Sequence, residues 1–237
     1  MKNSVEVCFS PAIFPRFENP EANVVVVDIL RATSAIVTAF MNGVNHIIPV
    51  GTLEEAKAMK GKGYIVAAER DGIVRDFADF GNSPYNFKEE IVKDKEIAYS
   101  TTNGTQAIHT ASNCHSVSIG AYLNLTALAN WLIKENRNVI ILCAAWKDKF
   151  NLEDTVYAGA LSELLLNHHD FETICDSTYA AIDLWTLAKQ DIMKYIDKAA
   201  QRSRLQKNGL DDVIEYCHTH DLTDIIPILN GKVLEKL

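Results

Sequence analysis

The sequence lacks several features that mark common classes of protein. Its 237 residues include five cysteines, but none forms the C-x-x-C pair that zinc ribbons and redox motifs require. Basic residues are fewer than acidic ones, 23 against 31, and the formal net charge is −8. Because proteins that bind nucleic acid usually carry a broad basic surface, we expect no nucleic acid partner. An anionic ligand would have to meet a local cluster of positive groups.

Long apolar segments are also missing. The longest uninterrupted apolar run, Val139–Trp146, is far shorter than the roughly 20 residues that cross a bilayer. Near the N-terminus, Lys2, Asn3 and Glu6 occupy positions that a secretory signal would fill with apolar side chains. We therefore expect no membrane contact and a cytoplasmic, reducing location. A homo-oligomer is compatible with the sequence, which does not fix the number of subunits.

The usual phosphate-handling motifs do not occur either. Neither G-x-x-x-x-G-K-[ST] nor G-x-G-x-x-G is present, so nucleotide-binding loops of those types are not supported. The segment after Asp28 begins like an aspartyl-phosphate motif, but Leu30 stands where the second aspartate is expected. The loop after Cys143 contains no arginine, which a phosphocysteine mechanism would need.

Short apolar runs alternate with helical patterns, which predicts an α/β fold with a mostly parallel sheet flanked by helices. We expect one domain spanning residues 1–237, or two small lobes around a cleft. Its C-terminal portion, residues 171–237, reads as helical and is expected to cover one face of the sheet. The expected strands are Val5–Phe9, Val24–Val27, His46–Val50, Tyr64–Ala67, Glu96–Ser100, Ser116–Ile119 and Val139–Cys143. The expected C-terminal helices are Thr178–Lys189, Ile192–Arg204 and Leu210–His218, followed by a short apolar piece, Ile225–Leu229.

Acidic side chains follow three of the expected strands. Asp28, Glu69 and Asp154 should meet at one edge of the sheet, because ligands of open α/β sheets bind beyond the carboxyl ends of the strands. Grouped carboxylates repel each other unless a cation neutralises them, and all-oxygen ligation favours Mg²⁺ over zinc. The alternative is that each acid pairs with a neighbouring basic residue or caps a helix.

Groups suited to an anion lie in the same loops. Thr101–Thr105 offers hydroxyls, an amide and a glycine just before a helix, so backbone N–H groups should face an incoming anion. Arg31 and Arg70 follow two of the candidate metal acids, and guanidinium groups bind phosphate or sulfonate oxygens well. Ordinary helix capping and local salt bridges would produce the same pattern.

Taken in order, these loops resemble one family, the 2-phosphosulfolactate phosphatases, which are Mg²⁺-dependent acid phosphatases of coenzyme M biosynthesis. The resemblance spans almost the whole chain and rests on the segments Val24–Ser34, Glu69–Gly72, Gly81–Pro84, Thr101–Thr105 and Leu152–Asp154, with a C-terminal pattern from Ser203 through Gly209 and Leu210 to Pro227.

The resemblance implies hydrolysis of the phosphate monoester 2-phospho-3-sulfolactate to 3-sulfolactate and phosphate. Asp28, Glu69 and Asp154 would be the catalytic acids and would hold Mg²⁺ directly or through water. The small anionic substrate would be bound by the remaining candidates, Arg31, Arg70, Asn82, Ser83, Thr102, Asn103, Gly104 and Thr105. We expect direct attack by water and not a phospho-enzyme.

One segment departs from the family pattern. Where the family usually has Cys-Ala-Gly before its Glu-Asp pair, this chain has Cys143, Ala144, Ala145 and Trp146. Alanine resists the positive φ that glycine tolerates, and Trp146 is bulky beside the expected cleft. Two other functions therefore stay open. One is a phosphatase for another small phosphorylated hydroxy acid, and the other is a non-catalytic protein that binds small anions.

Overall fold

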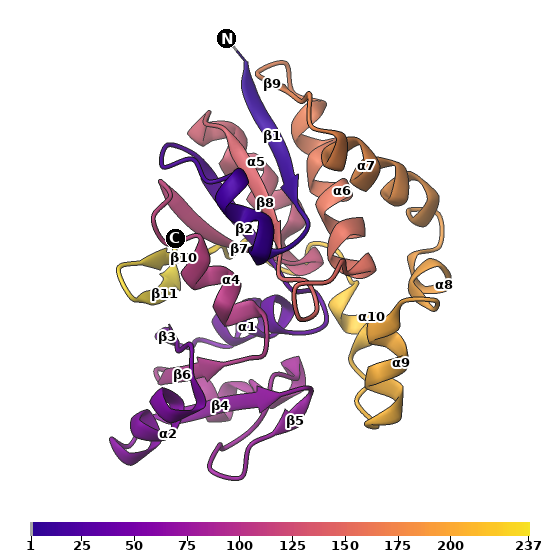
Figure 1. Cartoon of the computed structure of the whole chain (residues 1–237). Helices are drawn as coiled ribbons and strands as arrows, with labels where there is room; N and C mark the ends of the chain where they lie inside the picture. Colours follow the sequence, from indigo (N-terminus) through magenta and orange to yellow (C-terminus); the bar gives the residue numbers. More distant parts are fainter. Residues whose placement is uncertain (1) are drawn as a thin grey trace.

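The computed structural model describes residues 2–237, whose strands form one eleven-stranded sheet with helices on both sides (Figure 1). The strand order is β5-β4-β6-β3-β11-β10-β7-β2-β8-β1-β9. The strands are β1 (Asn3–Cys8), β2 (Asn23–Val27), β3 (His46–Pro49), β4 (Ile65–Arg70), β5 (Ile73–Val74), β6 (Glu96–Ser100), β7 (Ser116–Gly120), β8 (Val139–Cys143), β9 (Phe171–Glu172), β10 (Pro227–Asn230) and β11 (Val233–Lys236).

Two groups of parallel strands make up most of the sheet. One group is β4-β6-β3 and the other is β7-β2-β8-β1-β9. Every expected strand is present, with ends shifted by at most a few residues, and the α/β prediction is confirmed. In β2 all five residues are buried, as expected for a strand covered on both faces.

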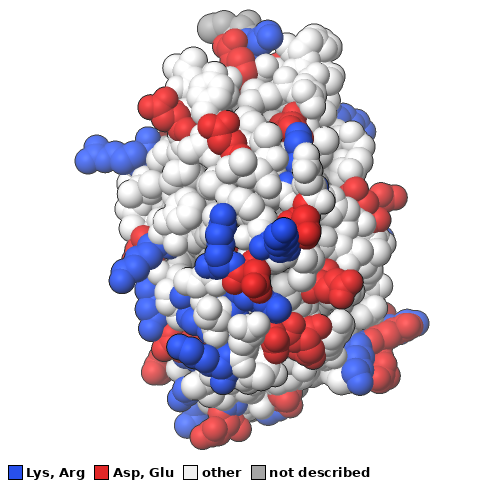
Figure 2. Space-filling view, turned by 90° about the vertical axis from the view of Figure 1, so that its right-hand side faces the viewer, with Lys and Arg blue, Asp and Glu red and all other residues white. Residues whose placement is uncertain are grey.

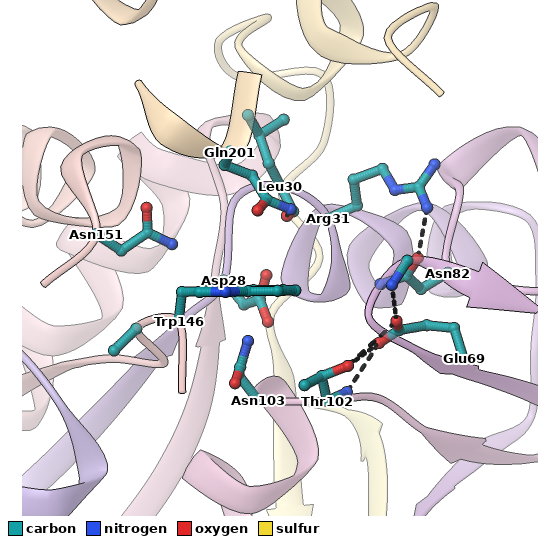
Figure 3. Close-up of a pocket in the computed structure, with 12 residues that line it drawn as sticks. Asp28, Leu30, Arg31, Glu69, Asn82, Thr102, Asn103, Trp146, Asn151 and Gln201 are labelled. Atoms are coloured by element: carbon teal, nitrogen blue, oxygen red, sulfur yellow. Dashed lines mark hydrogen bonds between the residues drawn. The ribbon is translucent and has the colours of Figure 1, made fainter. Parts of the chain in front are cut away.

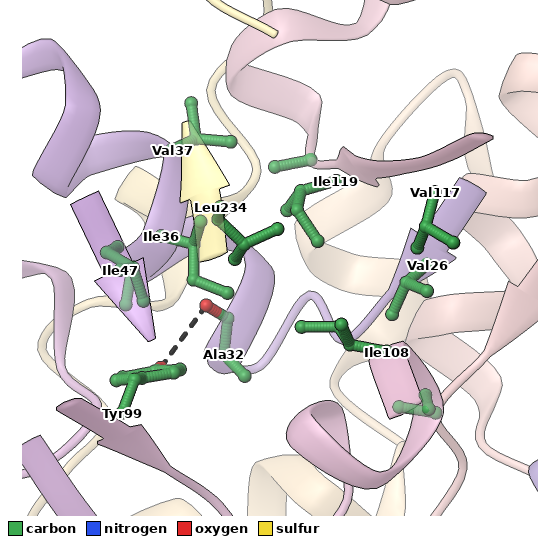
Figure 4. Close-up of a cluster of buried hydrophobic side chains, with 14 of the residues drawn as sticks. Val26, Ala32, Ile36, Val37, Ile47, Tyr99, Ile108, Val117, Ile119 and Leu234 are labelled. Carbon is green, nitrogen blue, oxygen red and sulfur yellow. Dashed lines mark hydrogen bonds between the residues drawn. The ribbon is translucent and has the colours of Figure 1, made fainter. Parts of the chain in front are cut away.

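Alternate residues of β2 pack into two separate layers, since successive side chains of a strand point to opposite faces. Val24 and Val26 contact the face covered by α1 (Ala32–Met41) and α4 (Gly104–Thr110), which Figure 4 shows in part. Val25 and Val27 contact the other face, covered by α5 (Leu125–Glu135) and α6 (Leu152–Leu166). The remaining helices of the first 170 residues are α2 (Leu53–Gly61), α3 (Glu89–Val92) and three short 3-10 turns, Pro11–Arg16, Pro84–Asn86 and Tyr122–Asn124.

The C-terminal portion differs from the expectation in two ways. Its helices α7 (Asp176–Ala188), α8 (Ile192–Ile196), α9 (Ala200–Lys207) and α10 (Ile214–Cys217) do pack on the α5/α6 face. The expected helix Ile192–Arg204 is two helices, because the backbone of Ala199 is extended (φ −66°, ψ 138°) and ends the helical run. The expected helix Leu210–His218 is reduced to the single turn of α10.

The last segment does not cover the sheet but joins it. Strands β10 and β11 form an antiparallel hairpin that lies between β7 and β3 and so connects the two parallel groups. Pro227, which we expected to interrupt an apolar piece, is the first residue of β10, where the missing N–H is tolerated. The prediction for this segment was wrong.

The surface carries charges of both signs, as the composition leads us to expect. Figure 2, which faces the side of α7 and α8, shows Lys and Arg interspersed with Asp and Glu. Among residues 2–237, no helix combines the length and apolarity needed to cross a membrane.

Candidate active site

A polar pocket lies at the carboxyl ends of β2, β4, β6 and β8, where the fold places ligands (Figure 3). It encloses about 360 Å³ of empty space, part of it open to solvent. Gln201 reaches it from α9, about 170 residues further along the chain than Asp28. The other lining residues come from the strand ends and the loops that follow them: Asp28, Leu30, Arg31, Glu69, Gly72, Asn82, Thr102, Asn103, Ala145, Trp146 and Asn151.

Asp28 is the central carboxylate of the pocket. It follows the buried β2 and is itself buried, and its Oδ1 accepts a hydrogen bond from the backbone N–H of Ala32 at 3.3 Å. Burial raises the pKa of Asp28 to about 7, and the nearby charge of Glu69 acts in the same direction. A carboxylate in this position is stabilised in its charged form by any cation that enters the pocket.

Glu69 links the loops after β4 and β6. Its Oε1 accepts hydrogen bonds from the backbone N–H of Thr102 at 2.8 Å and from the Thr102 hydroxyl at 3.2 Å. Its Oε2 accepts a bond from the backbone N–H of Gly72 at 2.6 Å. The Glu69 carboxylate is therefore held in a fixed position on the side of the pocket facing Asp28 (Figure 3).

Asp154 is fully buried and does not line the pocket. Its Oδ1 accepts a bond from the backbone N–H of Ile29 at 2.8 Å, and its Oδ2 accepts one from Asn151 Nδ2 at 3.2 Å. Burial raises its pKa well above the usual value. In this arrangement Asp154 orients the Asp28 loop and Asn151 from behind.

The three candidate metal acids do not form a compact ligand set. Across residues 2–237, the only three His, Cys, Asp or Glu side chains with ligand atoms all within 4.8 Å are His168, His169 and Asp170. That group follows the C-terminus of α6, whereas Asp154 lies in the first turn of that helix. An ion bound to Asp28 would therefore contact some of the other candidate acids through water molecules, and the ligand assignment stays a prediction.

The residues around Asp28 nevertheless fit a hard cation. Both carboxylate oxygens of Glu153 are buried without a hydrogen-bond partner among the described residues, and burial raises the pKa of Glu153 to about 7. The charge of Asp28 raises the pKa of Glu153, and Asp28 and Glu153 both raise the pKa of Asp154, so these negative charges are close enough to interact. One or two carboxylates with water ligands are the usual way in which proteins hold Mg²⁺.

Arg31 supplies positive charge inside the pocket. The side chain is only 3% exposed, and its Nη2 donates a hydrogen bond to Asn82 Oδ1 at 2.8 Å. Within residues 2–237, its Nη1 is buried and has no partner. Burial lowers the pKa of Arg31, but guanidinium remains charged in proteins. This unpaired donor is suited to an anionic ligand, as the sequence predicts.

Arg70, the other predicted arginine, does not line the pocket. Glu69 and Arg70 are neighbours in β4, so their side chains point to opposite faces and only one can enter. The Arg70 guanidinium donates instead to the carbonyl oxygen of Glu69 at 2.6 Å and to Ser100 Oγ at 3.0 Å. The structure places it in a supporting position outside the pocket.

Three other predicted substrate residues, Ser83, Gly104 and Thr105, also lie outside the lining. Thr105 is buried and its hydroxyl donates to the carbonyl oxygen of Thr101 at 3.1 Å. Gly104 lies directly behind Asp28, where a Cβ would be 3.0 Å from Asp28 Oδ2. Their substrate-binding roles stay predictions. Thr102, Asn103 and Asn82 do line the pocket as expected.

Several lining residues were not predicted as site residues. Asn151 precedes the Leu152–Asp154 motif and Gly72 ends the Glu69–Gly72 motif, so both had a local signal. Gln201 had none, because it lies on a helix distant in the sequence. At the departure from the family pattern, Ala145 adopts a positive φ of 62°, the conformation that glycine tolerates and alanine resists.

Comparisons with known proteins point to one family. The profile of the 2-phosphosulpholactate phosphatase family matches residues 8–232. A probable 2-phosphosulfolactate phosphatase of Clostridium novyi is 39% identical over 207 residues, which cover 86% of this chain and 87% of the relative. The probable 2-phosphosulfolactate phosphatase of Caldanaerobacter subterraneus is 36% identical, with 90% of each chain covered. A protein of the same name from Thermotoga maritima is 34% identical, with 90% of this chain and 91% of the relative covered.

Proposed function

Because the chain belongs to the 2-phosphosulpholactate phosphatase family and is thus a phosphatase, we propose that it hydrolyses 2-phospho-3-sulfolactate to 3-sulfolactate and phosphate in a Mg²⁺-dependent reaction. The observation that carries this proposal is that one polar pocket brings together the carboxylates of Asp28 and Glu69 and the buried, positively charged side chain of Arg31. Within the proposal, the enzyme is cytoplasmic and serves coenzyme M biosynthesis. Its five unpaired cysteines fit a reducing compartment.

The substrate is strongly anionic, since it carries phosphate, carboxylate and sulfonate on three carbons. Arg31 is the buried cation of the pocket and would bind phosphoryl oxygens, while the hydrogen bond from its Nη2 to Asn82 holds the guanidinium in place. Thr102 and Asn103 lie on the opposite side and would donate to the remaining oxygens. Hydrogen bonds from buried donors such as Arg31 are stronger than the same bonds in water, because the local dielectric constant is lower.

Asp28 and Glu69 would hold Mg²⁺ from the pocket, with Asp154 acting directly or through water. The bound ion supplies Lewis-acid stabilisation of the charge on the transferring phosphoryl group. Glu69 is kept in place by the backbone amides of Thr102 and Gly72, and Asp154 keeps the loop after β2 in position through Ile29. Both contacts reduce the reorganisation needed when the substrate binds.

In the proposed reaction a water oxygen forms a bond to phosphorus as the bond between phosphorus and the C2 oxygen breaks. The leaving oxygen takes up a proton and becomes the hydroxyl of 3-sulfolactate. Asp28 is a poor nucleophile while it holds a cation, so attack by water is favoured over a phospho-enzyme. Acid quenching during a single turnover of substrate with a radiolabelled phosphoryl group should leave no phosphoryl label on the protein; label trapped on Asp28 would contradict this step.

The function is tested by phosphate release from 2-phospho-3-sulfolactate with and without a chelator. We expect activity that the chelator abolishes and Mg²⁺ restores. Asp28→Asn and Glu69→Gln should each lower kcat/KM by about 100-fold or more and raise the Mg²⁺ concentration needed for half-maximal rate. Asp154→Asn should also lower kcat/KM and raise the Mg²⁺ requirement, while its melting temperature should change little.

A matched control is Asp183→Asn, which removes an exposed carboxylate on α7, outside the pocket. This variant should keep the wild-type rate and metal requirement. If all three pocket variants kept wild-type rates at limiting Mg²⁺, the metal assignment would be wrong. Tight substrate binding without any turnover would instead favour the non-catalytic anion-binding protein.

A second substrate is favoured by one observation, the bulky Trp146 in the pocket lining. The enzyme could act on another small phosphorylated hydroxy acid without a sulfonate. Rates on phospholactate and phosphoglycerate, compared with 2-phospho-3-sulfolactate, separate the two. A site built for a sulfonate should lose a factor of about 100 or more in kcat/KM when that group is missing, and equal rates would favour the alternative.

A further inference from the structure

The mouth of the pocket carries a second guanidinium that was not among the predicted site residues. Arg204 lies on α9 next to two lining residues, Gln201 and Trp146. These three side chains are called the rim group below. They come from two segments more than fifty residues apart in the sequence, so only the fold brings them together.

The rim group fixes the orientation of Arg204. Its Nε donates a hydrogen bond to Gln201 Oε1 at 2.7 Å, and its Cζ lies 4.2 Å from the centre of the Trp146 ring. Gln201 is fixed in turn, because its Nε2 donates to the carbonyl oxygen of Leu30 at 2.9 Å. A guanidinium stacked on an aromatic ring keeps its edge available for hydrogen bonds, since those bonds lie in its plane.

The terminal nitrogens of Arg204 remain available. Across residues 2–237, Nε is its only atom that donates a hydrogen bond within the chain. The side chain is partly exposed. Arg70, by contrast, uses both terminal nitrogens on the carbonyl oxygen of Glu69 and on Ser100, and it lies outside the pocket. Of these two arginines, Arg204 is therefore the one that can receive an anion at the pocket mouth.

The charges around the rim group also favour this role. Inside the pocket, Arg31 is the buried guanidinium, and it lies beside the acids that would hold Mg²⁺. A substrate with phosphate held there still brings a carboxylate and a sulfonate. The sulfonate is separated from the phosphate-bearing carbon by a further methylene group, so it is the anionic group that extends furthest from the phosphate and toward the mouth.

We propose that Arg204 is the specificity-determining residue for the sulfonate: its terminal nitrogens bind the sulfonate oxygens while Trp146 and Gln201 hold the guanidinium flat. This inference rests on the proposed function, since it concerns the same substrate. It also gives Trp146, which departs from the family pattern, a positive role as the platform on which Arg204 rests.

Kinetics on two substrates test the proposal. Arg204→Gln should raise KM for 2-phospho-3-sulfolactate by about 10-fold to 100-fold with little change in kcat, because a charge-assisted bond to the sulfonate is lost. On phospholactate, which has no sulfonate, the same variant should show the wild-type KM. Arg204→Lys keeps the charge but lacks the planar guanidinium, so its KM for 2-phospho-3-sulfolactate should lie between those of the wild type and Arg204→Gln.

A matched control is Arg202→Gln on the same helix. Arg202 forms ion pairs with Asp197 at 3.4 Å and Asp211 at 3.8 Å, and it is not part of the pocket lining or the rim group. It should keep the wild-type KM for both substrates. Thermal melting of all variants checks that they are folded, and an equal loss on both substrates in Arg204→Gln would overturn the sulfonate contact.

The competing role for Arg204 is neutralisation of the buried Glu153, whose charge is close enough for each group to affect the pKa of the other. Arg204→Gln is therefore also made together with Glu153→Gln. If Arg204 only offsets Glu153, the double variant should bind the product 3-sulfolactate as tightly as Glu153→Gln alone. If it contacts the sulfonate, the loss of affinity should persist at about 10-fold or more.

Calorimetric binding of 3-sulfolactate and lactate separates the failure of this proposal from failure of the proposed function. Wild type should bind 3-sulfolactate more tightly than lactate, and Arg204→Gln should abolish that preference. One outcome is that the wild type hydrolyses neither phosphate ester, while Arg204→Gln still loses the preference for 3-sulfolactate over lactate. That result would refute the proposed substrate of the phosphatase but support the sulfonate contact. A preference unchanged in Arg204→Gln would overturn the contact whether or not the enzyme turns over.

Discussion

At the scale of single residues, Gly104 brings the backbone into close contact with the carboxylate of Asp28. A Cβ at this position would lie 2.7 Å from Ala32 Cβ and 3.0 Å from Asp28 Oδ2. Gly104→Ala should therefore displace the Asp28 side chain, lower kcat/KM by at least about 10-fold and cost about 1–3 kcal/mol of stability. Steady-state kinetics and urea unfolding measure the two effects.

Gly61, the last residue of α2, is the control for this change. Nothing lies within 4 Å of a Cβ built there, so Gly61→Ala should leave activity unchanged. Its stability should be equal to wild type or higher by about 0.5 kcal/mol, because alanine is the better helix former. Wild-type kinetics in Gly104→Ala would show that this close approach is not needed for catalysis.

At this scale the sequence predicted the pocket residues that follow parallel strands. Asp28, Arg31, Thr102 and Asn103 line the pocket because strand ends at one edge of a sheet converge. The sequence could not decide which of two strand neighbours faces inward; in the structure Glu69 lines the pocket and Arg70 does not, and the substrate-binding role of Arg70 stays a prediction. Contacts that depend on tertiary packing, above all those of α9, had no local pattern to reveal them.

At the scale of elements, the β10–β11 hairpin is the part of the sheet that joins its two parallel groups. Leu234 of β11 is fully buried, pairs with Ile47 of β3 and packs with the core of the α1/α4 face (Figure 4). Leu234→Ala should cost about 2–5 kcal/mol of stability through lost burial and a cavity. Leu237→Ala removes a half-exposed leucine three residues later and should cost far less.

Chemical denaturation of both leucine variants, with activity measured on the folded protein, tests the bridging role. Equal destabilisation by the two changes would mean that the hairpin packs loosely and does not hold the sheet together. Loss of cooperativity in Leu234→Ala, seen as a lower slope of unfolding against urea, would instead show that the two groups of strands unfold separately when the hairpin is weakened.

The hairpin was missed although the sequence contained a signal for it. The loop between β10 and β11 has two residues, and the first, Gly231, adopts a positive φ of 60°, which such short loops require. The buried parallel strands were predicted because their runs of Val and Ile are continuous. The hairpin strands are short and partly exposed, so their apolar pattern is weak and Pro227 hides it.

At the scale of the whole molecule, stability should depend on pH through a histidine buried beneath the α5/α6 face. His218 is only 5% exposed, and its Nδ1 donates to the carbonyl oxygen of Ile214 at 2.7 Å. Its Nε2 is buried without a partner among the described residues. Burial lowers the pKa of His218 to about 4 from an ordinary value of 6.5, so the native state holds it neutral.

The direction of the effect follows from proton binding. Between pH 6.5 and about 4, the unfolded chain protonates this histidine and the native state does not, so acid favours unfolding. The contribution of His218 is complete above pH 6.5 and is lost as the pH falls toward 4, by about 3 kcal/mol in total. Titration of carboxylates adds to the acid dependence and has to be subtracted.

His218→Asn makes that subtraction possible, since asparagine can donate to Ile214 but cannot take up a proton in this range. The free energy of unfolding of both proteins is measured by urea denaturation from pH 7.5 to pH 4.5. The variant should be less stable at pH 7.5, because a smaller side chain leaves a cavity beside Tyr122, but its stability should fall less steeply with acid. Parallel curves for the two proteins would mean that His218 titrates normally, and hence that water reaches its ring in the folded molecule.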